Sequence, residues 1–170
     1  IDVAHHASGV MAAGFPDRMK VDFRSAVEAM FDSGRYGQKT GAGFYRYEQD
    51  KRGKPLKSVD PQVAAILKDI CAPAREFADQ EIIERMMIPM CNELVRCLDE
   101  NIVDSVGEAD MALVLGIGFP LFRGGALRFM DHMGLNEFCA AADRFAGIAP
   151  VYAVPQSLRA RARDGKRFYS

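Results

Sequence analysis

The 170-residue sequence lacks several features that would place it directly in a class of proteins. It has no tryptophan, no apolar run of the roughly 18 residues that a membrane-spanning helix needs, and no signal peptide at its start. Its formal net charge is −1, so no overall field attracts nucleic acid or an anionic membrane. We therefore expect neither a membrane span nor a nucleic-acid partner.

The four cysteines form no CxxC pair, which is the spacing typical of redox and zinc sites; they are Cys71, Cys91, Cys97 and Cys139. Three of them occupy core-like positions, which suits reduced thiols and predicts a cytoplasmic protein. The sequence also begins at Ile1 without an initiator methionine. That start favours a piece excised from a longer chain.

Familiar catalytic constellations are absent as well. The sequence contains no HExxH or GxSxG motif and no Ser-His-Asp order, and its acidic residues are scattered. His5 and His6 are adjacent, so on a helix they point about 100° apart and do not easily share a metal ion. His132 stands alone. We therefore predict no catalytic and no metal-binding residue, and structural or surface roles for the histidines.

Helical periodicity dominates the sequence that is present. The apolar stripes at helical spacing are Val3, Ala7, Val10 and Met11; Phe23, Ala26, Val27, Met30 and Phe31; Val63, Ile66, Leu67, Ile70 and Cys71; Ile83, Met86, Met87, Met90, Leu94 and Leu98; and Leu135, Phe138, Cys139, Ala142 and Phe145. Among these, we predict burial in the core for Phe23, Phe31, Ile66 and Met90. No strand alternation of useful length appears, so the predicted fold class is all-α.

Helix boundaries are marked by local signals. Residues placed to start helices are Asp2, Asp60 with Pro61, Ser105 with Glu108 in a capping-box pattern, and Pro155. Gly34 is placed to end the second helix, and Pro89 should kink the longest one, which spans residues 79 to about 101. Residues 44–47 predict a short extended piece, and the polar segment KRGKPLKS at 51–58 is the best linker candidate.

The glycine-rich segment at 34–43 allows two interpretations. Its lysine and glycines could form a phosphate cradle, but the segment is not GxxxxGK[ST] and follows a helix instead of a buried strand. Gly41-Ala42-Gly43 also lacks the third glycine of a dinucleotide fingerprint. Glycines that serve turns with positive φ are the favoured interpretation.

A second glycine-rich segment, GIGFPLFRGG at 116–125, is the most unusual stretch. Apolar side chains on such a bend can form the wall of an acyl-chain pocket. The alternative is a helix–helix corner whose glycines permit close packing. The spacing alone does not choose between the two.

The C-terminal end is rich in basic residues: Arg159, Arg161, Arg163, Lys166 and Arg167. The phosphates of CoA or RNA could bind there, but a solvated helix face is the more usual explanation. Helical spacing also turns Arg161 away from Arg159 and Arg163, which weakens any single basic patch.

A weak similarity between two parts of the sequence suggests an internal repeat. Gly134-Leu135-Asn136 begins a helix much as Ile1-Asp2 does, and Arg167-Phe168-Tyr169 is similar to Gly43-Phe44-Tyr45. If this similarity reflects a repeat, residues 1–47 are the end of one repeat and residues 79–170 are a second, more complete repeat.

At GRYGQKTGAGFYRY the sequence resembles a known family. A G-Q-K-x-G-x-G-F-Y ending closes the C-terminal domain of 3-hydroxyacyl-CoA dehydrogenases. The segments IDVAHHASGVMAAGFPDRM, EIIERMMIPMCNELVRCLDENIV, EADMALVLGIGFPLFRGGALRFMD and YAVPQSLRARA are similar to bacterial fatty-acid β-oxidation multienzymes of this family. The resemblance covers nearly all 170 residues. It implies a C-terminal-domain-like helical bundle with one domain ending at 1–50, a linker with a helix at 51–78, and a second domain at 79–170.

The resemblance also implies an activity for a longer protein. Such a protein joins an enoyl-CoA hydratase/isomerase domain to a Rossmann dehydrogenase domain, which passes hydride from C3 of a 3-hydroxyacyl-CoA to NAD⁺. Its general base is a His paired with a Glu, and no residue of this sequence matches either. The implied partners are 3-hydroxyacyl-CoA, a thiolase β-subunit and a second copy of the protein. This chain alone is expected to be inactive and to hold no cofactor.

Within that scheme, these helices would cover the acyl-CoA cleft, with Leu115, Gly116 and Phe119 as substrate-contacting wall. Two positions depart from the family pattern. Glu84-Arg85 stands where the first helical domain of the family has an Asn-Arg pair, and Leu115 stands where relatives often have Tyr. Leu115 keeps an apolar wall but offers no hydroxyl group. The rival interpretation is a dimerisation or docking module without substrate contact.

Overall fold

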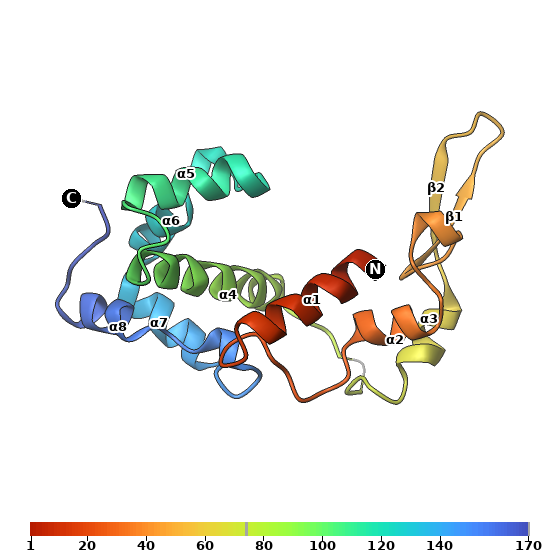
Figure 1. Ribbon diagram of the computed structural model, residues 1–170, viewed down its shortest axis with the longest axis horizontal. Helices are drawn as coiled ribbons and strands as arrows, with labels where there is room; N and C mark the ends of the chain where they lie inside the picture. The colour runs from red at the N-terminus through yellow and green to blue at the C-terminus, as the bar shows by residue number, and fades with distance from the viewer. Residues whose placement is uncertain (74, 170) are drawn as a thin grey trace. The chain divides into compact units, whose positions relative to one another are not determined.

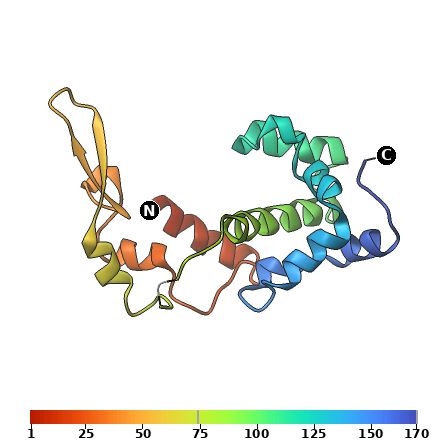
Figure 2. The same cartoon turned by 180° about the vertical axis from the view of Figure 1, so that it is seen from behind.

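The computed structural model describes residues 1–73 and 75–169. Its contacts divide the chain into two compact units, Ile1–Glu76 and Phe77–Ser170. Helices predominate in both units, as Figures 1 and 2 show from opposite sides. The all-α prediction is therefore confirmed for most of the chain. Ala74 and Ser170, which the predicted linker and second domain include, lie outside the described residues.

The first unit consists of helices and a β-hairpin: α1 (Asp2–Gly14), α2 (Ala26–Asp32), η1 (Gln38–Thr40), β1 (Tyr45–Gln49), β2 (Pro55–Val59) and α3 (Pro61–Leu67). Asp60 caps α3 as predicted, because its side chain accepts a hydrogen bond from the backbone N–H of Gln62. Asp2, in contrast, is wrong as an N-cap. Ile1 holds that position, and Asp2 is the first helical residue.

The β-hairpin corrects the linker prediction at 51–58. β1 and β2 pair antiparallel from Tyr45 opposite Val59 to Gln49 opposite Pro55. The Asp50 carboxylate closes the turn by accepting two backbone N–H groups of the following residues, both at 2.8 Å. Both strands are largely exposed, so they lack the alternation of apolar and polar residues by which a strand is recognised in a sequence.

The second unit is a helical bundle: α4 (Asp79–Asp99), α5 (Val106–Ile117), η2 (Leu121–Arg123), α6 (Ala126–Met133), α7 (Leu135–Asp143), η3 (Pro150–Tyr152) and α8 (Gln156–Arg163). Its buried residues form one cluster that draws on all five α-helices. α6 was not among the predicted helices, because no apolar stripe was recognised between the glycine-rich segment and Leu135. No helix within the described ranges is both long enough and apolar enough to cross a membrane.

The buried face of α4 differs from the predicted stripe. Ile83 and Met86 are 49% and 72% exposed, whereas Ile88, Cys91 and Val95 are buried. The buried face is turned by roughly 100°, which is the angle between successive helical residues. Methionine and isoleucine occur on both faces, so the pattern in the sequence did not define a single stripe. α4 continues through Pro89, and the predicted kink stays a prediction.

The chosen core residues are only partly buried. Phe23 is 53% exposed and is wrong as a core residue, while Phe31, Ile66 and Met90 are half-buried. Met30, on the same helix as Phe31, is fully buried. The first predicted helix is confirmed by α1, and its apolar stripe of Val3, Ala7, Val10 and Met11 is exposed. The stripe on α3 is at most half-buried, and Cys71 at its end is exposed.

Candidate functional site

The bend at 116–125 joins α5 to α6 and contains the residues predicted to contact substrate. Gly118, with φ of +72°, ends α5 in the left-handed conformation that glycine adopts easily. Leu115 is 78% exposed and Gly116 is also exposed, whereas Phe119 is only 5% exposed and packs in the core. The structure therefore places two of the three predicted residues at the surface and one beneath it.

A buried carboxylate explains the second glycine of the Gly124-Gly125 pair. Asp110, 2% exposed on α5, accepts backbone N–H groups from Leu127 at 2.7 Å and Arg128 at 3.2 Å, and so caps α6. A Cβ on Gly125 would lie 2.1 Å from the Asp110 carboxyl carbon. Only glycine, whose φ here is +113°, lets the carboxylate reach the start of the helix.

The hydroxyl of Tyr169 completes this network by donating to Asp110 at 2.8 Å. Burial, together with this hydrogen bond, raises the pKa of Tyr169 to about 12. The phenol therefore stays protonated at neutral pH and remains a donor. These contacts connect the end of the chain to α5 and α6, and they support the interpretation of the glycine pair as a packed helix corner.

The apolar side chains around the bend remain exposed. They are Met111, Leu115, Ile117, Leu121 and Phe122, and we call them the α5–η2 apolar surface. Phe122 and Leu121 are 84% and 72% exposed. Side chains of this kind can bury apolar groups but cannot donate or abstract a proton. The surface is therefore suited to contact with an acyl chain or another protein segment.

The glycine-rich segment at 34–43 is organised around Arg35. The buried guanidinium donates to the carbonyl of Gly43 through Nε at 3.0 Å and Nη2 at 2.8 Å, and to Asp60 Oδ2 at 2.7 Å. The hydrogen bond from Arg35 holds the pKa of the Asp60 carboxyl below its ordinary value. Arg35 thus fastens the glycine loop to the start of α3.

The same loop does not fit a dinucleotide. A Cβ on Gly43 would lie 2.9 Å from the Cα of Gly37, so the two backbones pack against each other instead of opening a cradle. Lys39 forms an ion pair with Asp2. The described residues contain no parallel sheet, and NAD binding at this loop has no support in the structure.

His5 and Cys91 contact other parts of the fold, whereas His6, His132 and Cys71 are exposed. The His5 ring stacks on Phe31, with centroids 4.1 Å apart. Burial raises the pKa of the Cys91 thiol to about 12, so this cysteine is not a thiolate at neutral pH. Among residues 1–73 and 75–169, no group of three or more His, Cys, Asp or Glu is arranged to hold a metal ion.

The arginines of α8 are engaged within the second unit. Arg159 donates to both carboxylate oxygens of Asp143, at 2.6 and 3.2 Å. Arg161 lies over the Phe168 ring, 4.7 Å from its centroid. Arg163 is 3.7 Å from the carboxylate of the residue that follows it. The basic end is therefore held by neighbouring groups and does not form one open patch.

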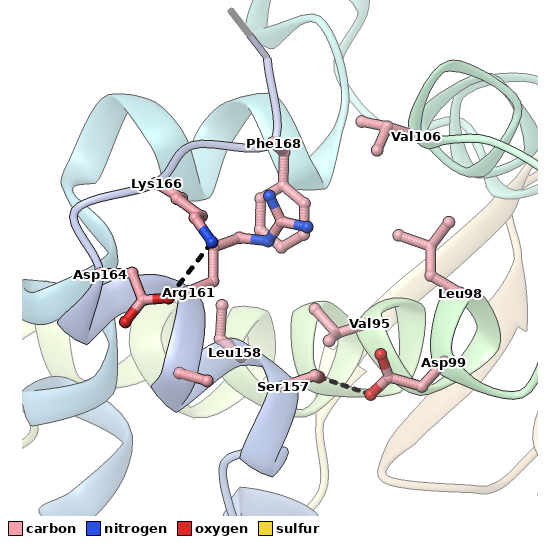
Figure 3. Close-up of a pocket in the computed structure, with 11 residues that line it drawn as sticks. Val95, Leu98, Asp99, Val106, Ser157, Leu158, Arg161, Asp164, Lys166 and Phe168 are labelled. Atoms are coloured by element: carbon pink, nitrogen blue, oxygen red, sulfur yellow. Dashed lines mark hydrogen bonds and ion pairs between the residues drawn. The ribbon is translucent and has the colours of Figure 1, made fainter.

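Figure 3 shows a hollow of about 390 Å³ between α4, the start of α5, and α8. Its apolar side chains include Val95, Leu98 and Leu158. Lys166 lies 3.3 Å from Asp164, and Ser157 donates to Asp99 at 2.5 Å. Two acidic and two basic side chains line the hollow, so their formal charges balance.

Glu84 replaces the asparagine that the family carries in its first helical domain, and the structure gives it a different role. Its carboxylate accepts from Arg144 Nη2 at 2.7 Å and from Gln80 Nε2 at 3.1 Å. Arg85 pairs with Glu81 at 3.0 Å. Both residues therefore connect parts of the second unit to each other.

Helix α2 of the first unit and helix α8 of the second unit end in the same local structure. In the first, Gly34 has a φ of +68° and its N–H donates to Phe31 O, while Arg35 N–H donates to Met30 O. In the second, Gly165 has a φ of +66°, and the N–H groups of residues 165 and 166 donate to the matching carbonyls of α8. The end of α4 at Asn101 has the same pattern, so this helix ending is not specific to a repeat, and the internal repeat stays a prediction.

Comparisons with known proteins agree with the resemblance. Residues 1–47 match the family model of the 3-hydroxyacyl-CoA dehydrogenase C-terminal domain. Over 170 residues the chain is 54% identical to the fatty acid oxidation complex subunit alpha of Pseudomonas entomophila (strain L48). That alignment covers 100% of this chain and 24% of the relative, so the chain spans about a quarter of the relative's length.

Among solved structures, the chain is similar to the dehydrogenase part of multifunctional enzyme 1 from C. elegans. The TM-score is 0.58 and the identity 24%, over 89% of this chain and 35% of that one. At this identity the likeness is one of fold. Residues 1–47 are thus similar to the C-terminal domain of 3-hydroxyacyl-CoA dehydrogenases, and the whole chain is similar to about a quarter of a fatty acid oxidation complex subunit alpha.

Proposed function

We propose that this chain is the helical, non-catalytic part of a longer fatty-acid β-oxidation multienzyme. The observation that carries the proposal is the 54% identity along the whole chain to a fatty acid oxidation complex α-subunit. The longer protein would act as a 3-hydroxyacyl-CoA dehydrogenase with NAD and as an enoyl-CoA hydratase/isomerase. Its catalytic base and its NAD site would lie outside these residues.

Within that enzyme, the bend at 116–125 would form apolar wall beside the acyl chain. The exposed side chain of Leu115 and the exposed backbone of Gly116 suit direct contact with substrate. Phe119 is buried and would support this wall from beneath. Leu115 would offer the substrate no hydrogen bond where a tyrosine would, so the wall would select for apolar groups alone.

The domain organisation belongs to the same proposal. Residues 1–50 would end a first C-terminal helical domain, 51–78 would link it to the next, and 79–170 would form the second domain. The exposed apolar face of α1 supports the first assignment, because α7 at the matching place in the second unit is largely buried. The proposed partners are a thiolase β-subunit and a second copy of the protein, in the cytoplasm.

The rival function is a docking module that never meets substrate. The α5–η2 apolar surface would suit that role equally well, because its chemistry is contact alone. The two functions differ in what a change at Leu115 does. A substrate wall affects kinetics, whereas a docking surface affects assembly.

The first test is NADH oxidation with acetoacetyl-CoA by the purified 170-residue chain, beside an intact homologue as control. We expect a folded, helical chain without turnover. Turnover that persists after repurification would overturn the proposed division of labour.

The second test introduces Leu115→Arg into the longer enzyme, with Leu56→Arg on the exposed β2 as the matched control. Leu115→Arg should raise KM for long-chain 3-hydroxyacyl-CoA about ten-fold and leave the oligomeric state unchanged. Unchanged kinetics with a loss of assembly would favour the docking module instead.

A further inference from the structure

Two adjoining hollows lie along α6, and the first of them also includes the end of the bend at 116–125. One, of about 490 Å³, is lined mainly by apolar side chains that include Phe122 and Phe129. The other, of about 440 Å³, is polar and includes Arg167. Arg128 and His132 line both. Because these two residues are one helical turn apart, the hollows form the two sides of a single surface, which we call the α6 hollow.

The α6 hollow carries unbalanced positive charge. Arg123, Arg128 and Arg167 line it, and none of them has a carboxylate partner among the described residues. The single carboxylate in the lining, Asp131, accepts two backbone N–H groups at 2.9 and 2.8 Å. Three guanidinium groups against one carboxylate leave a formal charge of +2.

Aromatic rings hold two of these guanidinium groups in place. Arg123 lies between the rings of Phe122 and Phe129, with centroid distances of 5.3 and 5.4 Å. Arg128 lies 3.9 Å over the ring of Tyr169. Stacking uses the face of a guanidinium and leaves its N–H edge available to donate to an oxyanion. The arginines are therefore partly ordered before any ligand binds.

Gly124 contributes to this arrangement. A Cβ at this position would lie 2.5 Å from Cδ of Arg128, so the missing side chain provides the room that the arginine stem occupies. Gly124 also has a φ of +73°. The two glycines therefore leave space for different side chains: Gly125 for the capping carboxylate of Asp110, and Gly124 for the stem of Arg128.

We propose that the α6 hollow binds a small organic phosphate, with its phosphate groups at Arg123, Arg128 and Arg167 and its apolar or planar part in the hollow beside Phe122. Arginine matches phosphate oxygens with paired N–H donors, which accounts for the polar side. The apolar side accounts for an organic ligand in place of a free inorganic anion. The hollow of Figure 3 differs in its charge, since the two acidic and two basic side chains that line it balance.

The test is isothermal titration calorimetry of the 170-residue chain with ADP and, separately, with inorganic pyrophosphate. ADP should bind saturably and more tightly than pyrophosphate. Arg123→Gln with Arg128→Gln should weaken both ligands by about ten-fold or more, because each lost charge-assisted contact is a large part of such an affinity. Arg167→Gln supplies a second variant, since no side-chain contact of Arg167 supports the fold in the described residues.

Two matched controls separate this site from general electrostatics. Arg163→Gln removes the same charge from an exposed position on α8 and should change affinity less than about two-fold. Leu121→Ser, in the apolar side, should weaken ADP and leave pyrophosphate unchanged. The proposal is overturned if neither ligand saturates, if pyrophosphate binds as tightly as ADP, or if Arg163→Gln matches the loss seen with the double variant.

Discussion

Each unit of this chain contains a helix that is followed by a glycine and a basic residue, yet the two units are stabilised in different ways. In the second unit, α7 and α8 pack against α4 and α6, and the buried residues form an apolar cluster. In the first unit, α1 contacts α2 and α2 contacts α3, but α1 buries no residue completely. There the buried set is small and includes the ion pair of Arg35 with Asp60.

The comparison shows that the apolar pattern of a helix does not by itself ensure that its apolar face is buried. An amphipathic helix gains most of its stability from a covered apolar face and little from propensity alone. Val3, Val10 and Met11 provide such a face on α1, but it is exposed. We infer that the arginine network in the first unit maintains the loop geometry there, while an apolar core maintains it in the second.

The largest effect should come from filling the space at Gly125. Gly125→Ala places a methyl group against Asp110 at a φ of +113°, and we expect a loss of about 4 kcal/mol in unfolding free energy. Gly118→Ala is the matched control, because its φ is +72° but its surroundings are open. It should cost about 1 kcal/mol. Urea unfolding followed by circular dichroism measures both, and equal losses would contradict the capping role of Asp110.

The next largest effect distinguishes the two faces of α4. Ile88→Ala removes a buried side chain and should cost about 3 kcal/mol. Met86→Ala, two residues away and 72% exposed, should change stability by less than about 0.5 kcal/mol. Thermal and urea unfolding provide the comparison. A larger loss of unfolding free energy for Met86→Ala than for Ile88→Ala would favour the buried face that the sequence predicted.

Hydrogen exchange tests the difference between the units directly. Amides in the middle of α1 should exchange at least about ten-fold faster than amides at Cys91 to Val95 in α4, because local opening of α1 exposes no buried side chain. NMR-detected exchange at constant pH gives both rates. Equal protection would show that α1 is covered in solution.

The smallest effect concerns acid. Because the pKa of Asp60 is lowered in the folded chain, its carboxylate stabilises the first unit above the ordinary value of 3.8. That stabilisation is lost as the pH falls through the lowered pKa. Urea midpoints of the α3 amide signals, measured from pH 6 to pH 2, should therefore decline in acid. Asp60→Asn should flatten this decline. An unchanged profile would contradict a stabilising role for the ion pair of Arg35 with Asp60.

Much of the helical framework could be predicted from short-range signals. Ser105 accepts the N–H of Glu108, Asp60 caps α3, and Gly34 ends α2, each as expected. A capping signal acts within about four residues, so a sequence displays it completely. The extended piece predicted at 44–47 is confirmed by β1. The second strand was missed because it is exposed, and α6 was missed because glycines precede it.

The candidate sites were less accessible to such reasoning. Leu115 and Gly116 lie at the surface as an exposed wall requires, and their contact with substrate stays a prediction. The three arginines of the α6 hollow are scattered from 123 to 167, and no motif unites them. Their common surface exists because α6 and the last described residues meet.

The sequence by itself determined where most helices begin and end and which family the chain resembles, because caps, glycines and motifs act between near neighbours. The tertiary structure alone decided which face of α4 is buried, why Gly125 is a glycine, and which arginines are paired. Those outcomes depend on contacts such as Asp110 with Leu127 and Arg35 with Asp60. These contacts join residues far apart in the chain, and burial sets their strength only after the helices have packed.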